Sequence, residues 1–309
     1  MGARGGGLML QETVASRTPV CRLCGSSDAT LVSATVSEAP ESAVYSCSGC
    51  GIVYVFPIMS EEEESSFYAR QFEEYMARRS GPGWKSPGAH FESYRPEGER
   101  RVPLVIPHVR PGDALLEIGS STGFFLEAIR ERVATVTGVE PSEAYRAYAS
   151  SRGIETVENL ERLGDRRFDV IALYYVVEHL RDPVGYAAAM RGRLNKGGRL
   201  LIEVPNVEDA LLSLYRIPAF SDFYWQRAHY HNFSRHTLRA VLERAGYRVN
   251  TFPVQRYDLS NHLVWMKEGK PGGAGRYAGV IGDEVDAAYR RTLMAQWICD
   301  TVFAVAMKD

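Results

Sequence analysis

The chain has 309 residues, enough for one large domain or for a main domain with a small one beside it. Hydrophobic residues make up 45% of it and charged residues 24%, as in an ordinary globular protein, and no stretch reaches the ~20 apolar residues that a membrane-spanning helix needs. The net charge of −2 provides no overall attraction to nucleic acid or anionic lipid. Because the N-terminus also lacks the apolar segment of a signal peptide, we expect a cytoplasmic protein with neither membrane nor nucleic acid as a partner.

The sequence divides into four predicted parts. A start rich in Gly, Arg and Ser is predicted to be disordered, and a segment with paired cysteines among short β-like runs follows it. Next comes a charged segment with scattered aromatic residues, and then a long region in which strand-like and helix-like runs alternate. The ranges are 1–18 for the disordered start, 19–58 for a zinc-binding domain, 59–100 for a helical linker or lid, and 101–309 for the main domain.

The linker is predicted to begin as a helix over residues 61–79. It should continue as a loop, because Gly and Pro punctuate residues 80–90. Three residues on the linker are candidates to close over a site in the main domain: Tyr68, Tyr75 and His90.

Four of the five cysteines form two C-x-x-C pairs, each followed by a glycine. In a reducing compartment this spacing favours a metal site over disulfides. Four thiolates so arranged typically enclose one structural zinc ion and leave no position for water, and iron is the alternative metal. Such an ion stabilises a segment too small to sustain its own core. The predicted ligands are Cys21, Cys24, Cys47 and Cys50, whereas Cys299 is predicted to be a buried apolar residue.

Alternating strand-like and helix-like runs in the main domain predict right-handed βαβ units and a parallel sheet with helices on both faces. Residues 169–175 and 199–204 are almost entirely apolar, as expected of central parallel strands. Predicted strands cover 114–118, 135–140, 154–157, 169–175, 199–204, 247–254 and 301–307, and predicted helices cover 123–133, 143–151, 183–194, 234–246 and 284–297.

A glycine-rich turn, GSSTG, follows the first predicted strand of the main domain. Gly119 and Gly123 allow the backbone to approach a ligand closely, while Phe124 takes the place of the third glycine in the dinucleotide-binding pattern. Glu117 at the strand end would repel a pyrophosphate but can pair with an ammonium group. The turn therefore favours a ligand other than a dinucleotide, with a purely structural strand-to-helix turn as the alternative.

An acidic residue, Glu140, ends the second predicted strand, 21 residues after Gly119. At that position a carboxylate can accept hydrogen bonds from both ribose hydroxyls of a nucleoside. The alternative is a solvated acid at a strand end.

A carboxylate and an imidazole, Glu178 and His179, follow the buried strand 169–175. Ligands of open parallel sheets bind at the carboxyl edge of the strands, and an imidazole titrates near neutral pH. The pair is therefore a candidate for proton transfer. Packing at the start of a helix, or lining of a ligand pocket without proton transfer, is the alternative.

The block from Val102 to Pro205 resembles the class I S-adenosylmethionine-dependent methyltransferases. That family has an hh(D/E)hGxGxG turn, an acidic residue after the second strand, an (E)H(L/V)xDP segment after the fourth, and an LkpGG turn before the fifth. These stand here as LLEIGSSTG, Glu140, VVEHLRDP and LNKGGRLLIEVPN, with Ser121 in place of the commonest middle glycine. With the later HYHNFSRHTLRAVLERAGYRV, the resemblance covers most of residues 100–309.

The resemblance implies an α/β fold with a doubly wound, seven-stranded Rossmann-like methyltransferase sheet of order 3-2-1-4-5-7-6 and a small zinc-ribbon-like domain before it. The last strand, 301–307, would be antiparallel and lie between 199–204 and 247–254. Residues 256–300 would form an insertion over the active site. Its candidates for substrate contact are Arg256, Tyr257, Asn261, His262 and Trp265, with local packing as the alternative for most of them.

The resemblance further implies S-adenosyl-L-methionine as cofactor and an in-line displacement, for which the protein supplies alignment and, where needed, a general base. His179 is the first candidate for that base, with Glu178 orienting it and with His229 or His231 as alternatives. The predicted cofactor site consists of Glu117, Gly119, Ser120, Ser121, Gly123, Glu140, Tyr174 and Tyr75.

The order of zinc segment, aromatic helix and methyltransferase domain looks like that of bacterial small-molecule methyltransferases, including deoxysugar C-methyltransferases. We therefore expect methyl transfer to a small polar metabolite, such as a sugar or a sugar-containing intermediate, with O-methylation favoured. Sugar C-methylation, a non-catalytic S-adenosylmethionine-binding protein and an RNA methyltransferase are alternatives. An RNA enzyme predicts a basic face with interleaved aromatics, whereas residues 21–50 carry only Arg22 against Asp28, Glu38 and Glu41.

Overall fold

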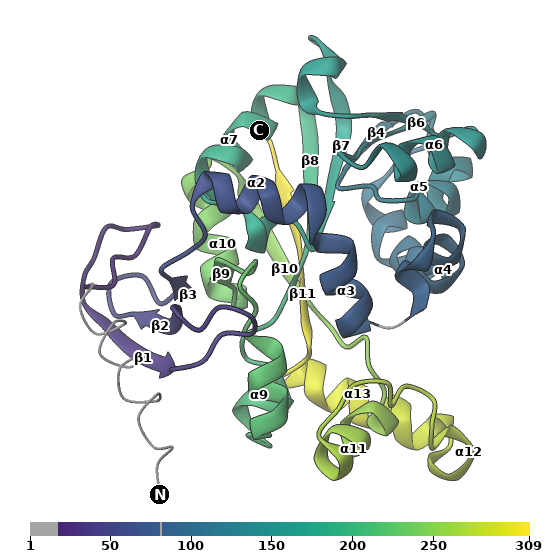
Figure 1. The fold of residues 1–309 in the computed structure, drawn as a ribbon. Coiled ribbons are helices and arrows are strands. Elements are labelled where there is room, and N and C mark those ends of the chain that lie inside the picture. The colour runs from purple at the N-terminus through teal and green to yellow at the C-terminus, as the bar shows by residue number, and fades with distance from the viewer. Residues whose placement is uncertain (1–17, 81) are drawn as a thin grey trace, which may run out of the picture.

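A computed structural model describes residues 18–80 and 82–309 of the chain. The predicted disordered start falls outside the described residues, apart from position 18. The described chain forms a large mixed sheet with helices on both faces and a smaller sheet at the N-terminal side (Figure 1).

The main domain is built on a sheet that has seven strands within the described residues, in the order β6-β5-β4-β7-β8-β11-β10. Neighbouring strands from β6 to β8 are parallel, and β11 is antiparallel to both β8 and β10. The predicted order 3-2-1-4-5-7-6 is thereby confirmed, including the position of the last strand. The strands are β4 (Ala114–Ile118), β5 (Thr135–Val139), β6 (Glu155–Val157), β7 (Phe168–Tyr174), β8 (Leu194–Pro205), β10 (Arg248–Val254) and β11 (Thr301–Met307).

Alternate side chains of the central strands point to opposite faces, and each face has its own apolar core. Leu115 and Val170 pack under α4 and α5, whereas Leu116 and Ile171 pack under α7 and α10. Burial on both faces explains why these strands are apolar throughout. The helices of the main domain are α4 (Pro87–Val105), α5 (Phe124–Ile129), α6 (Glu143–Ser151), α7 (Pro183–Arg193), α8 (Ala210–Ser213), α9 (Pro218–Tyr224), α10 (Arg235–Arg244), α11 (Leu259–Glu268), α12 (Ala278–Ile281) and α13 (Asp283–Ala295).

The smaller sheet has the order β1-β2-β3-β9 and carries the four paired cysteines. Its first three strands are β1 (Ala29–Ser33), β2 (Ala43–Cys47) and β3 (Val53–Phe56), and we call residues 18–58 the cysteine knob. The fourth strand, β9 (His231–Asn232), comes from the main domain and pairs antiparallel with β3. The knob is therefore joined to the main domain through backbone hydrogen bonds as well as through the chain.

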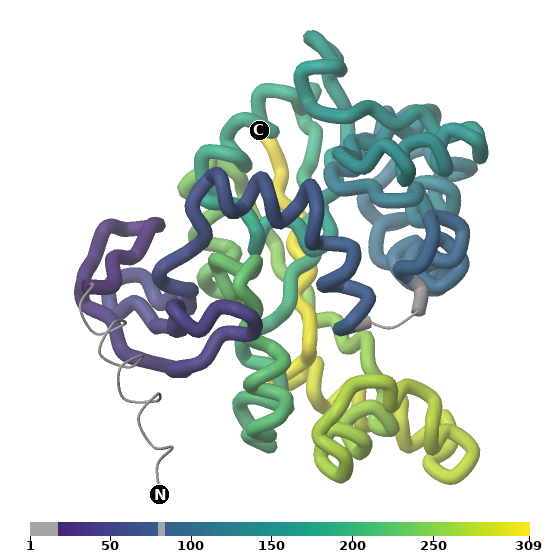
Figure 2. The backbone as a smooth tube through the Cα atoms, in the orientation of Figure 1, coloured from purple at the N-terminus to yellow at the C-terminus, as the bar shows by residue number. Residues whose placement is uncertain are grey.

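Two helices, α2 (Glu61–Arg70) and α3 (Phe72–Ser80), lead from the knob to α4 and cross in front of the large sheet (Figure 2). The sequence predicted a single helix here, but the helix breaks at Gln71. The predicted loop 80–90 is also shorter than expected, because α4 already begins at Pro87. Ser86 caps α4 by accepting a hydrogen bond from the Ala89 backbone, and proline suits a first helical position.

Two further boundaries differ from the prediction. Strand β8 begins at Leu194 rather than at Arg199, because the Lys-Gly-Gly turn is part of the extended segment. The insertion 256–300 contains α11 and α12 as well as the predicted helix near its end. Within residues 18–80 and 82–309, no helix is both long enough and apolar enough to span a bilayer.

Candidate functional site

The glycine-rich turn, residues 119–123, lies at the carboxyl edge of β4 and leads into α5; we call it the cofactor turn. Gly119 and Gly123 have φ of 72° and 78°, and a Cβ on either would come within 2.9 Å of a neighbouring side chain. Glycine is required at both positions for conformation and for space. Ser121 also has a positive φ of 51°, which explains why glycine is commonest at this place in the family.

Buried polar atoms without a hydrogen-bond partner in the described chain gather around the cofactor turn. They are Glu117 Oε2, the hydroxyls of Ser120 and Ser121, and the hydroxyls of Tyr145 and Tyr174. Buried polar groups in proteins are normally hydrogen-bonded, so this set fits a polar ligand held at the turn. S-adenosylmethionine, with its ammonium, carboxylate and ribose hydroxyls, is such a ligand.

Burial raises the pKa of Glu117 to about 8, because the side chain is 2% exposed, and the nearby Arg101 opposes that shift. An ammonium group of a ligand would favour the ionised carboxylate. Glu117 can therefore recognise the methionine end of the cofactor by releasing its own proton.

Glu140 follows β5 and reaches the cofactor turn. Its carboxylate accepts hydrogen bonds from the backbone N–H of Ser121 at 2.9 Å and of Ser142 at 2.8 Å. Each carboxylate oxygen can accept a second bond, so two sites remain for the ribose hydroxyls. Burial raises its pKa, which backbone hydrogen bonds counteract. The residue thus both shapes the turn and is available to a nucleoside.

An aromatic group from α4, α6 and the turn just before α4 covers the other side of the cofactor turn, and the sequence had indicated only its His90. His90 lies 3.1 Å from the Thr122 hydroxyl through Nδ1 and stacks on Tyr94 with ring centroids 4.4 Å apart. Trp84 and Tyr145 complete the group, with ring centroids 4.6 and 5.0 Å from His90. Of the three predicted lid residues, His90 is therefore the one beside the cofactor turn. Burial lowers its pKa to about 4, so its ring is neutral.

Glu178, His179 and His229 meet beyond the carboxyl end of β7, and we call them the base cluster. Their ligand atoms all lie within 4.8 Å of one another, close enough to hold a metal ion. His179 Nδ1 donates to the Ala228 carbonyl at 2.9 Å, since a carbonyl can only accept. The other ring nitrogen, Nε2, is therefore the one with a free lone pair.

Burial sets the protonation of the base cluster. It lowers the pKa of His179 to about 4, and it lowers the pKa of His229 well below the ordinary histidine value, with a further contribution from His179. Burial also raises the pKa of Glu178 to about 8, and neither carboxyl oxygen of Glu178 has a hydrogen-bond partner among the described residues. At neutral pH the cluster holds two neutral imidazoles and a protonated carboxyl group.

The helices α2 and α3 cover this cluster. The Tyr68 hydroxyl lies 3.2 Å from His179 Nδ1, and Arg181, just beyond His179, forms an ion pair with Glu64 of α2. Tyr75 is fully buried and donates from its hydroxyl to Gln226 at 3.1 Å. The structure thus brings Tyr68 to the predicted base, and it places Tyr75, predicted as a cofactor residue, against the segment that carries His229.

His231, the third histidine proposed as base, lies elsewhere. It forms part of β9, where it pairs with Tyr54 of β3, and it is 1% exposed. His231 helps to join the main domain to the knob. Its assignment as a base stays a prediction.

A buried ion network at the same edge of the sheet also escaped the sequence analysis. Glu203 of β8 is fully buried and accepts hydrogen bonds from Arg100 at 2.6 Å and Arg101 at 3.2 Å. Arg256 donates to the Tyr175 hydroxyl at 2.7 Å and lies 3.3 Å from Glu97. The sequence offered one sign of this network, a lone glutamate in the apolar run RLLIEV. A buried carboxylate needs a cation beside it.

Of the five candidates on the insertion, Arg256 is the one that reaches this network. Tyr257 is 41% exposed, His262 bonds to the Tyr289 hydroxyl at 2.7 Å, and Trp265 packs in the apolar cluster under α9. Asn261 is buried in α11. The alternative of local packing therefore describes His262, Trp265 and Asn261.

The four cysteines of the knob converge as predicted for a metal site. Their sulfur atoms lie within 4.8 Å of one another, with 3.6 Å between Cys21 and Cys50 and 3.4 Å between Cys24 and Cys47. Four thiolates bound at about 2.3 Å around a tetrahedral zinc ion are about 3.8 Å apart. The geometry therefore fits zinc, while Cys299, two residues before β11, is fully buried, as predicted.

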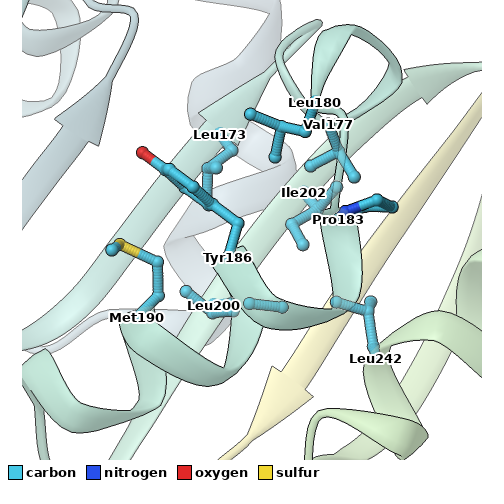
Figure 3. Close-up of a pocket in the computed structure, with 10 residues that line it drawn as sticks. Leu173, Val177, Leu180, Pro183, Tyr186, Met190, Leu200, Ile202 and Leu242 are labelled. Carbon is cyan, nitrogen blue, oxygen red and sulfur yellow. The ribbon is translucent and has the colours of Figure 1, made fainter. Parts of the chain in front are cut away.

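Two cavities lie away from these groups. One, between β7, β8 and α7, is lined by apolar side chains and Tyr186 and has a volume of about 10 Å³, at the lower limit for one water molecule (Figure 3). The other, of about 500 Å³, is an open groove between the knob and α8–α9. Neither contains a residue of the cofactor turn or of the base cluster.

The comparisons with known proteins agree with this geometry. The family model described as a methyltransferase domain matches residues 89–251, more than half of the chain. A ubiquinone biosynthesis O-methyltransferase of Dinoroseobacter shibae is 28% identical over 157 residues, which cover 46% of this chain and 63% of that protein. A tRNA U34 carboxymethyltransferase of Pseudoalteromonas translucida is 26% identical over 121 residues, which cover 34% of this chain and 36% of that protein.

These matches span less than two thirds of either relative. Among solved structures, a SAM-dependent methyltransferase from Archaeoglobus fulgidus has a TM-score of 0.50 at 19% identity, covering 77% of this chain and all of that one. This likeness supports the fold. The family match shows that the chain belongs to the methyltransferase-domain family.

Proposed function

We propose that the protein methylates an oxygen of a small, hydroxyl-bearing metabolite. The observation that carries this proposal is the base cluster, which presents a neutral histidine with one ring nitrogen fixed by the Ala228 carbonyl and the other free. An oxygen nucleophile needs such a group to take its proton, whereas a neutral amine can attack through its lone pair before any proton is lost. The printed name of the Dinoroseobacter relative, an O-methyltransferase, supports the same choice.

S-adenosylmethionine, when bound, supplies an electrophilic methyl group. The chain's own residues bind the cofactor at one end of the sheet edge and accept the acceptor's proton at the other. Glu117, Glu140 and the cofactor turn hold the cofactor, and the aromatic group around His90 covers it. His179 takes the proton of the acceptor hydroxyl through Nε2, and the protonated Glu178 is placed to orient that hydroxyl.

The acceptor contacts the groups between these two ends. Tyr224 has a buried hydroxyl without a partner in the described chain and lies near Glu178, and Arg256 holds the nearby Tyr175 hydroxyl. Hydroxyls and a guanidinium group suit a small polar molecule. A sugar or sugar-containing intermediate is one acceptor of this class, and C-methylation of a sugar is the alternative reaction.

In the cysteine knob, we propose one structural zinc ion bound by all four thiolates. Its ligand shell would be complete, so the ion has no place for a substrate. The knob's charged residues include Asp28, Glu38 and Glu41 against Arg22, which gives no reason to assign it to RNA.

Incubation with methyl-labelled S-adenosylmethionine and acceptor pools, followed by mass spectrometry, tests the reaction. The pools should contain catechols, sugars, nucleotide sugars and tRNA. Label on an oxygen of a small molecule supports the proposal. Label on carbon, on nitrogen or on tRNA contradicts it, and cofactor binding without any labelled product would show a non-catalytic protein.

His179→Asn tests the base, because asparagine keeps a polar side chain of similar size. Turnover should fall by about 100- to 10,000-fold, while cofactor affinity stays nearly unchanged. If His179→Asn is active and His229→Asn is not, the base is His229. A requirement for added Mg²⁺ or Mn²⁺ would assign the cluster to a metal ion instead.

A further inference from the structure

We propose that the cysteine knob positions residues 228–231, the base segment, so that zinc binding controls acceptor chemistry and leaves cofactor binding intact. This inference rests on the proposed function, since it concerns the segment that carries His229. It assigns to a remote metal site a role in catalysis that acts through the backbone.

The first observation is a direct backbone connection. Strand β3 follows the second cysteine pair, and it pairs antiparallel with β9, with Val53 opposite Asn232 and Tyr54 opposite His231. The Val55 backbone N–H donates to the Tyr230 carbonyl at 3.1 Å and so extends this pairing along the base segment. The position of the segment is therefore tied to the position of β3.

The second observation is a shared apolar core. Cys21, Cys47 and Tyr54 pack in the same cluster as Leu238 and Leu242 of α10, which follows β9. Arg244, at the end of that helix, donates to the Leu23 carbonyl between the first two cysteines at 2.9 Å. The metal-binding knuckles therefore contact the helix that follows the base segment.

The base segment meets the base cluster on its other side. Its first residue, Ala228, accepts the hydrogen bond that fixes the His179 ring, and the rings of His179 and His229 are 4.9 Å apart in an edge-to-face arrangement. Residues 228–231 thus contact β3 through Tyr230 and His231 and contact His179 through Ala228 and His229. A shift of β3 would move both the Ala228 carbonyl and His229.

A side chain also links the two sites. Tyr54 is 2% exposed, its hydroxyl has no hydrogen-bond partner among the described residues, and its neighbours include the thiols of Cys21 and Cys47. A hydroxyl so placed can donate to a metal-bound thiolate, as outer-shell groups of metal sites do. Because Tyr54 stands opposite His231, this contact would hold the register of the base segment.

The cofactor turn depends on other elements. Gly119 and Ser120 donate their backbone N–H groups to the Val139 carbonyl, Glu140 holds Ser121, and His90 of α4 holds Thr122. Loss of metal from the knob should therefore misplace the acceptor base while the cofactor site keeps its shape. Misplacement by about 1 Å can lower a rate by about 100-fold.

The experiment uses full-length Cys24→Ser, because Cys24 is exposed and its loss weakens the site without opening the core. Zinc is titrated into the metal-free variant while three quantities are measured: turnover, affinity for S-adenosylhomocysteine by calorimetry, and the histidine ring resonances by NMR. Cys299→Ser, which changes a buried cysteine outside the knob, is the matched control. His108, which packs against Phe252 and Phe303, is the internal reference ring.

Turnover and the resonances of His179 and His229 should follow zinc occupancy together, with a change in rate of about 10- to 100-fold. Cofactor affinity should change by less than about twofold. The His108 resonance should not change. Histidine resonances that ignore zinc would overturn the proposal, and so would cofactor affinity that falls in parallel with the rate. The zinc titration does not require His179→Asn to be inactive. Failure of the base assignment can therefore be told apart from failure of the zinc proposal.

Discussion

Removal of the Glu140 carboxylate gives the most direct test of the cofactor site. In the structure this group accepts the backbone N–H of Ser121 and of Ser142, and it keeps a free lone pair on each oxygen for a ribose hydroxyl. Glu140→Ala therefore removes two ligand hydrogen bonds, and it also frees Ser121, whose φ of 51° that bond helps to maintain. We expect S-adenosylmethionine binding to weaken by about 1 to 3 kcal/mol, or about 5- to 150-fold.

Isothermal titration calorimetry with S-adenosylhomocysteine measures this change. Glu140→Gln should show a smaller loss, because one acceptor oxygen remains. Glu143→Ala, which removes an exposed acid from the first turn of α6, is the control and should bind as the wild type does. Unchanged affinity in Glu140→Ala would refute the assignment of the ribose to this carboxylate.

Cofactor binding near pH 7 should release up to one proton, because Glu117 is protonated in the free protein, with a pKa of about 8, and must ionise to pair with an ammonium group. Calorimetry in buffers of different ionisation enthalpy measures that proton, which Glu117→Gln should abolish. Glu178 also has a raised pKa of about 8, so the folded state binds a proton that the unfolded state has lost above about pH 4.5, and stability should fall as pH rises from about 5 to 8. Thermal unfolding of Glu178→Gln should show a weaker decline over that range, and an unchanged slope would contradict the burial of this carboxyl group. Gly98→Ala should destabilise the protein by about 1 to 3 kcal/mol, because the added Cβ would lie 2.6 Å from the Phe124 carbonyl oxygen. Denaturant unfolding measures it, and Gly112→Ala, with open space around the new methyl group, should be nearly neutral. Turnover limited by His179 should stay constant down to about pH 5 and fall only near its pKa of about 4, since the neutral ring accepts the proton; a fall near pH 6.5 would contradict its burial.

The sheet could be predicted because its signals are local. Buried parallel strands such as β7 are apolar throughout, and the glycines of the cofactor turn mark the point where β4 passes into a helix. The two cysteine pairs could be recognised for the same reason, as each knuckle is a short segment with a fixed spacing. The helix start at Pro87 was missed because a proline after Ser86 indicates a helix cap as readily as a loop.

The contacts between distant segments could not be predicted in this way. Nothing in the order of residues places Tyr68 beside His179 or Tyr54 opposite His231, since both contacts depend on how α2 and β3 dock onto the sheet. The direction of the pKa shift of His179 was missed for the same reason. Its burial under α2 and the base segment is a tertiary property, so an ordinary histidine value was the natural expectation.

The fourth strand of the small sheet has a consequence for biosynthesis. Tyr54 of β3 and its strand partner His231 of β9 are 177 residues apart, so β9 is translated roughly 9 to 35 seconds after β3 at about 5–20 residues per second. Throughout that interval the outer edge of β3 is unpaired, and an unpaired strand edge is a template for association with other chains. The nascent protein is therefore most exposed to aggregation before β9 emerges, and the knob cannot be grafted onto another enzyme without β9.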